Sequence, residues 1–280
     1  MVIGINKLLR KCIVKSMHNS PASNSEIDLF NLKVQIIYLT YNRLYYTKIT
    51  LPALLDSSNH ISFQVRIVDN GSTDGTVKYL KSLNHPRIEK IIYNKKNKGL
   101  VQPTKQFWKE SNADLVGKID NDILVPKGWV QKLTEAHQRV PNLGVAGYCH
   151  FRQEDFDPKK IALKVEQINN INFRRQPWIG GNYIMKRSTV LNNKGYRQSR
   201  KLFQKRILYG FNKYQETLAK NGFIHGYLCD ENKSLFTWEH IDDPRHPLFY
   251  KDNEYYKIRN MTNKDFINSL KRDAKELLGG

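Results

Sequence analysis

The sequence predicts an α/β fold with a mostly parallel central sheet flanked by helices, followed by a less regular half. Short apolar runs alternate with helical stretches between residues 34 and 119, and clusters of Asp, Asn, Gly and Thr follow these runs. Strands that alternate with helices indicate parallel pairing through right-handed crossovers. A chain of 280 residues with 40% hydrophobic side chains can also bury a sizeable core.

The first half is expected to hold four strands, with a helix after each of the first three. The predicted strands are residues 34–39, 65–68, 88–93 and 115–119. The predicted helices end at Leu55 and Leu83 and, in the third case, cover residues 102–110. Ligands bind beyond the carboxyl ends of the strands in such sheets, so the polar loops there are the expected site.

Regular alternation ends after an apolar run at residues 144–149. The polar segment 151–177 is expected to contain a hairpin around Phe156, Ile168, Ile171 and Phe173. The following strand, helix, strand and strand are predicted at residues 178–187, 208–221, 223–228 and 234–238. A terminal helix is predicted in the last twenty residues, ending in Lys271–Leu278. The second half is therefore expected to be less regular than the first.

Residues 1–17 carry apolar side chains at three- and four-residue spacing with basic residues between them, which predicts a basic amphipathic helix. This helix is expected either to dock on the domain or to lie on an anionic membrane surface. No run approaches the roughly 18–20 apolar residues of a membrane span, and no signal-peptide pattern is visible. The expected location is the cytoplasm, with the basic helix as a route to the inner face of the membrane.

The chain is strongly basic, with 46 Lys and Arg against 26 Asp and Glu and a net charge of +20. This balance favours polyanionic partners such as phosphates, nucleic acid or an anionic membrane. The three cysteines, Cys12, Cys149 and Cys229, are scattered, which argues against a disulfide framework or a zinc site.

The triplet Asp120-Asn121-Asp122 ends the fourth predicted strand. Two carboxylates one residue apart can share Mn²⁺ or Mg²⁺ with substrate phosphates, because these ions prefer few carboxylates plus phosphate oxygens. A D-x-D triplet alone is more often a turn or a helix cap than a metal site. Its place after an apolar strand favours the metal site.

Three further motifs follow the preceding strands: Thr40-Tyr41-Asn42-Arg43, the DNGSTDGT loop at residues 69–76, and Asn97-Lys98-Gly99. With the D-x-D triplet, in this order and spacing, they resemble the family 2 glycosyltransferases, which have the GT-A fold. The resemblance is close over residues 33–130 and loose over 175–240. It implies a hexosyl- or N-acetylhexosaminyl-transferase that uses a nucleotide-sugar donor, commonly UDP-linked, and inverts the anomeric carbon.

The resemblance implies roles for individual residues. Thr40 and Asn42 would line the nucleoside pocket, and Asp69 would contact the base. Asp122 and His240 are the implied residues of a Mn²⁺ or Mg²⁺ site, and Asp120 would contact the ribose of the donor or the metal ion. The other residues expected to contact the donor are Arg43, Asn70, Ser72, Asn97, Gly99, Lys118, Asn121, Gly180, Gly181 and Arg245.

The resemblance also implies a division of the chain. Residues 31–150 would bind the nucleotide sugar, and residues 151–250 would bind the acceptor, a glycan or lipid-linked molecule, and complete the catalytic site. Trp178 and Asn182 are the expected acceptor contacts. Residues 1–30 and 251–280 would be a basic amphipathic segment with its linker and a helical tail.

The chain departs from its relatives at the catalytic base. Relatives carry a Glu-Asp pair at the start of the helix that ends here at Gly222, and the corresponding positions hold Gly210 and Phe211. An inverting displacement needs a carboxylate within reach of the acceptor hydroxyl. The remaining candidates are Glu216, Asp242 and Asp243, with Asp243 favoured because the proline after it holds its backbone extended.

Two other functions stay open at this stage. A catalytically inactive GT-A-like protein that binds nucleotide sugars or glycans would explain the missing Glu-Asp pair. A nucleic-acid-binding protein would explain the net charge of +20. Nucleic acid is not the expected partner, because no RRM, KH or helix-turn-helix signature accompanies the charge.

Overall fold

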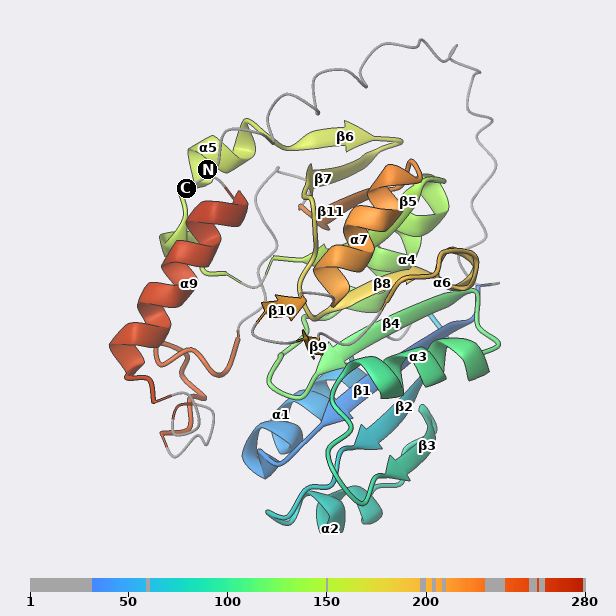
Figure 1. Ribbon diagram of the computed structural model, residues 1–280, viewed down its shortest axis with the longest axis vertical. Coiled ribbons are helices and arrows are strands. Elements are labelled where there is room, and N and C mark those ends of the chain that lie inside the picture. Colours follow the sequence, from blue (N-terminus) through green and yellow to red (C-terminus); the bar gives the residue numbers. More distant parts are fainter. Residues whose placement is uncertain are drawn as a thin grey trace.

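The computed structural model describes residues 32–58, 61–149, 151–196, 200–202, 205–207, 210–229, 240–251, 256 and 260–278. These residues form a nine-stranded sheet flanked by helices (Figure 1). The predicted basic helix over residues 1–17 and the predicted strand over 234–238 lie outside the described residues. Within the part of the chain that the structure describes, every helix is too short or too polar to span a bilayer.

The first half has the predicted alternation of strands and helices. Its four strands all run parallel: β1 (Val34–Thr40), β2 (Phe63–Asp69), β3 (Ile88–Tyr93) and β4 (Leu115–Asp120). The connecting helices are α1 (Leu44–Leu55), α2 (Thr76–Lys81) and α3 (Val101–Glu110). The spatial order β3-β2-β1-β4 reverses between β1 and β4, which is where ligands bind in open α/β sheets.

The second half of the sheet is mixed. It contains β5 (Leu143–Tyr148), β6 (Glu166–Ile168), β7 (Ile171–Arg175), β8 (Tyr183–Lys186) and β11 (Ile224–Leu228). Strands β5 and β11 are parallel, whereas β8 runs antiparallel between β4 and β5, and β7 and β6 form an antiparallel edge. The predicted hairpin is confirmed for Ile168, Ile171 and Phe173, because β6 and β7 pair through a turn in which Asn169 and Asn170 both have positive φ. Phe156, which was expected to belong to it, instead follows a helical turn at residues 153–155.

The remaining elements cover the sheet or lie at its edges. The helices are α4 (Trp129–Arg139), η2 (Gln153–Asp155), α5 (Pro158–Ala162), α6 (Arg187–Asn192), α7 (Phe211–Lys220) and α9 (Asn263–Leu278), and a separate hairpin joins β9 (Arg200–Leu202) to β10 (Lys205–Ile207). The sequence did not predict α4 or the β9–β10 hairpin.

Two apolar clusters fill the two faces of the sheet. Ile36 and Tyr38 of β1 belong to one cluster, and Ile37 and Leu39 belong to the other. Successive side chains of a strand point to opposite faces, and a central parallel strand is covered on both. This explains why β1 is apolar at every position between the buried Gln35 and Thr40, where the strand ends.

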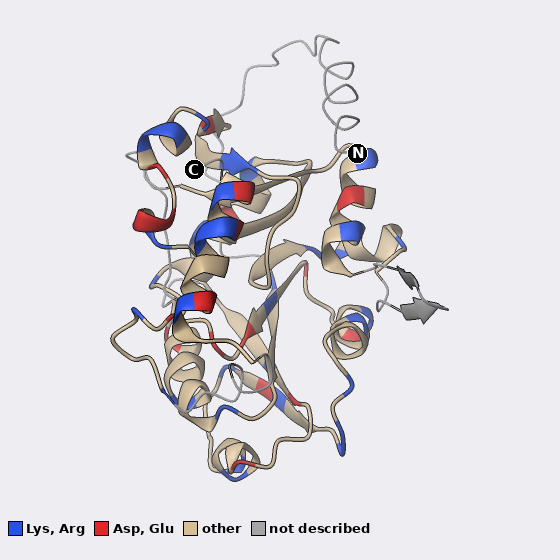
Figure 2. Ribbon diagram, turned by 60° about the vertical axis from the view of Figure 1, so that its left-hand side comes forward, with Lys and Arg blue, Asp and Glu red and all other residues tan. Residues whose placement is uncertain are grey.

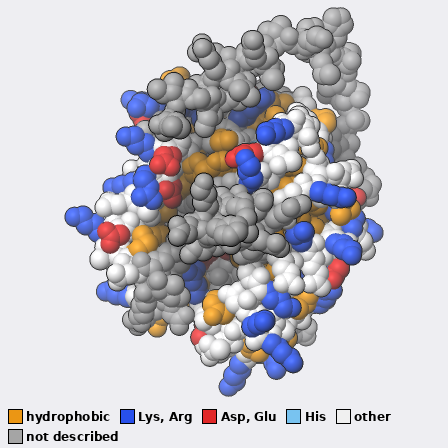
Figure 3. Space-filling model, in the orientation of Figure 1, with side chains coloured by type: hydrophobic (Ala, Val, Ile, Leu, Met, Phe, Trp, Pro, Cys, Tyr) orange, Lys and Arg blue, Asp and Glu red, His pale blue; other side chains and the backbone are white. Residues whose placement is uncertain are grey.

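Helix α9 lies on the side toward which β4 points (Figure 1). Its residues Phe266, Leu270, Ala274 and Leu278 are buried at four-residue spacing. Basic and acidic residues alternate along the rest of the helix (Figure 2). On the face shown in Figure 3, described basic side chains are spread among polar and hydrophobic ones.

Candidate functional site

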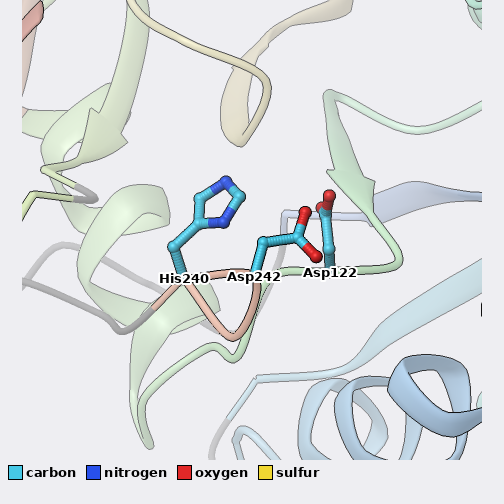
Figure 4. A group of neighbouring side chains, drawn as sticks. All are labelled: Asp122, His240 and Asp242. Atoms are coloured by element: carbon cyan, nitrogen blue, oxygen red, sulfur yellow. The ribbon is translucent and has the colours of Figure 1, made fainter. Parts of the chain in front are cut away.

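Three side chains that could hold a metal ion, Asp122, His240 and Asp242, converge beyond the carboxyl end of β4 (Figure 4). Asp122 follows β4 by two residues, whereas His240 and Asp242 come from a loop far along the chain. Ile123 forms an antiparallel bridge with His240, and Ile241 N donates to Asp122 O at 3.3 Å. These backbone contacts hold the two segments together.

The geometry of this group fits a divalent cation. One ligand atom from each of the three side chains lies within 4.8 Å of the others. The Asp122 side chain is 14% exposed and that of Asp242 is 1% exposed. Carboxylates suit Mg²⁺ and Mn²⁺, and imidazole is a common ligand of transition metals. Asp122 and His240, which the sequence predicts as metal ligands, thus both belong to this group.

Arg43 contacts both carboxylates of this group. Its Nη1 lies 2.5 Å from Asp122 Oδ2 and 3.1 Å from Asp242 Oδ2. Arg43 precedes α1 in a left-handed conformation, with φ of 62° and ψ of 46°, and Asn42 also has a positive φ. The guanidinium therefore neutralises part of the negative charge at the site.

The two carboxylates have pKa values shifted in opposite directions. Burial acts to raise the pKa of Asp122, but the neighbouring charges of Arg43 and His240 outweigh it and hold that pKa below its ordinary value. Burial, followed by the negative charge of Asp122, raises the pKa of Asp242 to about 7. A close carboxylate pair of this kind favours either a shared proton or a bound cation.

Asp120 belongs to a neighbouring arrangement rather than to this group. Lys118 Nζ lies 2.6 Å from Asp120 Oδ1 and donates to Gly181 O at 3.1 Å. Burial raises the pKa of Asp120 against the opposing charge of Lys118. A Cβ at position 181 would collide with the Asp120 carboxylate, so the glycine is needed for close approach. Asp242 occupies the place in the group that the sequence assigned to Asp120.

Asn121 ties β4 to the loop after β1. Its Nδ2 lies 3.1 Å from each of three acceptors, Thr40 Oγ1, Asn42 O and Thr47 Oγ1, which share its two N–H groups. Asn42 in turn bonds the next loop, because its Oδ1 accepts from Thr73 N at 2.8 Å and its N donates to Ser72 Oγ at 2.7 Å. Thr40, Asn42 and Asn121 thus order the loops at the sheet edge, and their predicted donor contacts stay predictions.

Asp69 anchors the loop after β2. It is fully buried, and its Oδ2 accepts from Gly71 N and Ser72 N at 3.0 Å each while Oδ1 accepts from Ser72 Oγ. Asn70 Nδ2 donates to Gly99 O at 3.1 Å, which connects this loop to the one after β3. Asn97 Oδ1 accepts from Gly99 N at 2.8 Å and closes that turn.

A pocket of about 450 Å³ opens beside the candidate metal ligands. One wall contains Asp120, Asp122, His240 and Asp242, with Gly181 and Asn182 beside them. Residues 261–273 contribute further lining side chains, which are Met261, Phe266, Ser269, Leu270, Arg272 and Asp273. The ring centroids of Phe266 and His240 are 6.4 Å apart, which places α9 directly against the site.

Three residues were expected as candidate bases. Of these, Asp242 alone is among the described residues that line the pocket. Glu216 is exposed on α7 and pairs with Lys213, so its helix position turns it away from the pocket. Asp243 is held instead by Arg245, whose Nε lies 2.9 Å from Asp243 Oδ1. The loop thus directs adjacent side chains to different partners: Asp242 lines the pocket, whereas Asp243, the favoured candidate, is not among the described residues that line it. Which carboxylate is the base stays a prediction.

Arg245 lies in an ion-pair network, not in the pocket lining expected of a donor contact. Its Nη1 and Nη2 donate to the two oxygens of Asp155 at 2.7 and 2.9 Å. Arg152 Nε also lies 3.3 Å from Asp243 Oδ2. This network fastens the loop of His240 and Asp242 to the turn around η2. The carboxylate of Asp155 is buried within this network. No motif in the sequence predicted a role for Asp155.

The loop that was expected to face the acceptor is held by α7. Gln215 Oε1 accepts from Ile179 N at 2.7 Å, and Gln215 Nε2 donates to Ile179 O at 2.9 Å. Asn182, on the same loop, lines the pocket, whereas Trp178 and Gly180 are not among the described residues that line it. Sequence reasoning missed Gln215, although a buried amide is unusual on a surface helix.

Comparison with known proteins identifies the family. Residues 35–211 match the model of glycosyl transferase family 2. The chain belongs to this family. Structural comparison agrees on the fold: a mannosyltransferase of Pyrobaculum calidifontis, in complex with GDP-Man and Mn²⁺, superposes with a TM-score of 0.56 at 16% identity, covering 82% of this chain and 61% of that one.

Curated family relatives are similar over part of their length. An uncharacterized glycosyltransferase of Bacillus subtilis is 33% identical over 121 residues, and a dolichol-phosphate mannosyltransferase of Pyrococcus furiosus is 27% identical over 114. Each match covers 41% of this chain and 30% or 32% of the relative. A probable polypeptide N-acetylgalactosaminyltransferase 8 of Homo sapiens is 27% identical over 114 residues, 38% of this chain and 18% of that protein.

Proposed function

We propose that this family 2 chain transfers a sugar from a nucleotide-sugar donor to a hydroxyl of a glycan or lipid-linked acceptor, with inversion and with a divalent cation. The convergence of Asp122, His240 and Asp242 at the reversal of strand order carries the proposal. The structural neighbour in complex with GDP-Man and Mn²⁺ supports this chemistry. We expect a UDP-linked donor, with GDP-linked sugars as the first alternative.

In this proposal Asp122 and His240 hold the cation. A bound cation would offset the negative charge that develops on the departing nucleoside diphosphate. Lys118 fixes Asp120 and the backbone of Gly181, both of which line the pocket. The ordered loops around Thr40, Asn42 and Asp69 would form the nucleoside end of the site.

Asp242 is the proposed proton acceptor. An inverting transfer needs a carboxylate oxygen near the acceptor hydroxyl, and the Asp242 carboxylate faces the pocket beside the cation ligands. The pocket is large enough for a sugar residue. Met261, Phe266 and Leu270 give the pocket an apolar surface for a sugar ring. Ser269 and Asp273, also in the lining, can form hydrogen bonds with sugar hydroxyls.

The proposal is tested by release of nucleotide from a panel of UDP- and GDP-sugars with Mn²⁺, with Mg²⁺ and with EDTA. Transfer is expected with a metal and is expected to stop in EDTA, and proton NMR of the product reports inversion. Tight binding of a nucleotide sugar without transfer to any glycan or lipid-linked acceptor would instead favour the inactive binder. Full turnover in EDTA would contradict the metal role.

A further inference from the structure

Arg43 lies in an unusual position for a donor contact. Its guanidinium is turned toward the two carboxylates, with Nη1 bonded to Asp122 at 2.5 Å and to Asp242 at 3.1 Å. The three side chains are 17%, 14% and 1% exposed, so water screens them weakly. The left-handed backbone at Arg43 is costly for a residue with a side chain, and such strain tends to persist at functional sites.

The Asp122 carboxylate cannot serve Arg43 and a cation without cost. Asp122, whose Oδ2 accepts from Arg43, belongs to the candidate metal group. A divalent cation at Asp122 would lie within a few ångströms of the guanidinium charge, and like charges at low exposure repel strongly. Cation binding and the Arg43 contact therefore oppose each other.

The proposed function supplies a second anionic partner for Arg43, the diphosphate of the donor. A guanidinium binds phosphate oxygens in a planar, two-pronged geometry, and it is less costly to desolvate than an ammonium. Arg43 stands in the loop after β1, at the edge of the sheet where the donor diphosphate would lie. A diphosphate bound there would be a new anionic partner for the guanidinium when the cation binds Asp122.

We propose that Arg43 is a built-in counter-ion that competes with the divalent cation for Asp122 and moves to the donor diphosphate when both ligands bind. This inference rests on the proposed function. Linkage then requires that nucleotide and cation strengthen each other's binding, beyond the direct contact between metal and phosphate. Without donor, Arg43 would keep the cation affinity low and hold Asp242 in an ion pair.

The test measures Mn²⁺ binding by calorimetry, with and without saturating UDP or GDP, in the wild type and in Arg43→Met. Methionine removes the charge but keeps an unbranched side chain. Without nucleotide, Arg43→Met is expected to bind Mn²⁺ about fivefold tighter or more. The gain in Mn²⁺ affinity on adding nucleotide is expected to shrink by a similar factor, and nucleotide affinity is expected to fall.

Lys213→Met is the matched control, because it removes one positive charge from the exposed pair with Glu216. It is expected to bind Mn²⁺ and nucleotide as the wild type does. Arg43→Lys keeps the charge on a shorter side chain and is expected to lie between wild type and Arg43→Met. If Arg43→Met fails to fold, as judged by circular dichroism, Arg43→Lys serves as the test variant.

Equal or weaker Mn²⁺ binding in Arg43→Met, or an unchanged nucleotide effect, overturns the counter-ion role while leaving the proposed function in place. An effect of the same size in Lys213→Met overturns it as well, because the change would then reflect net charge. Wild-type protein that binds neither Mn²⁺ nor any nucleotide overturns the proposed function itself.

Discussion

The two halves of the molecule position their functional side chains in different ways. In residues 32–149, polar side chains directly follow parallel strands and are ordered by hydrogen bonds between neighbouring loops, as Asn121 does with Thr40. In residues 151–278, the site is assembled from separate segments that are joined by ion pairs and by Gln215. A site built on consecutive strand ends can be predicted from sequence order, whereas one assembled from distant segments depends on contacts that the order does not reveal.

The largest expected effect tests the second half through two of its three candidate bases. Asp242→Asn is expected to lower turnover by about 10²–10⁴-fold, because the proton acceptor is lost while the nucleotide pocket is unchanged. Glu216→Gln is expected to turn over as wild type does, since Glu216 is exposed beside Lys213. Steady-state kinetics and Mn²⁺ affinity are measured for both. A strong loss of Mn²⁺ affinity in Asp242→Asn would make Asp242 a metal ligand instead of a base.

The second-largest expected effect tests the first half of the chain, at Asp122. Asp122→Asn is expected to lower activity at least about 100-fold, since loss of a metal-linked charge interaction costs several kcal/mol. Its circular dichroism is expected to match the wild type, because Asp122 follows β4 instead of packing in the core. Calorimetry with Mn²⁺ checks the cause. Unchanged Mn²⁺ affinity in this variant would remove Asp122 from the metal site.

A third prediction concerns the ion pairs that hold the second half together. Asp155→Asn is expected to lower the free energy of unfolding by roughly 3 kcal/mol, because a fully buried carboxylate loses its pair with Arg245. Glu216→Gln breaks an exposed pair and is expected to cost at most about 0.5 kcal/mol. Urea unfolding measures both. Equal losses of unfolding free energy in the two variants would show that the ion pairs around Arg245 add little to the stability of this half.

The outcome at individual residues shows what the sequence could and could not predict. Asp122 was predictable because an apolar strand ends just before it. Glu216 could have been excluded, since Tyr214 and Leu218 are buried four residues apart and mark the inward face of α7. The choice between Asp242 and Asp243 was out of reach, because Asp243 is held by Arg152 from a distant segment and by Arg245, which is itself oriented by distant Asp155.

A fourth prediction separates loop order from ligand contact in the first half. Asp69→Ala is expected to weaken UDP binding by roughly 1–3 kcal/mol, because the backbone N–H groups of Gly71 and Ser72 lose their acceptor. Asp69→Asn keeps one acceptor oxygen and is expected to lose less. Calorimetry with UDP compares them. Equal UDP affinity in Asp69→Ala and wild type would leave Asp69 as a turn residue only.

The smallest expected effect concerns a hydrogen bond that crosses between the halves. His137 of α4 is fully buried, and its Nε2 lies 2.7 Å from Ile184 O of β8. Burial lowers the pKa of His137 to about 4, against an ordinary value of 6.5. The folded protein therefore keeps this ring neutral over a pH range in which the unfolded chain takes up a proton.

Stability is consequently expected to fall as pH drops from about 6.5 toward 4, since the unfolded state binds more protons there. Between pH 7 and 5.5 the loss assigned to His137 is about 1 kcal/mol. Urea unfolding at both pH values, in wild type and His137→Gln, isolates it, because glutamine does not titrate and can still donate toward Ile184 O. The wild type is expected to lose about 1 kcal/mol more than His137→Gln over this interval. An equal loss in both proteins would mean that acids elsewhere set the pH dependence and that the contact between α4 and β8 does not titrate.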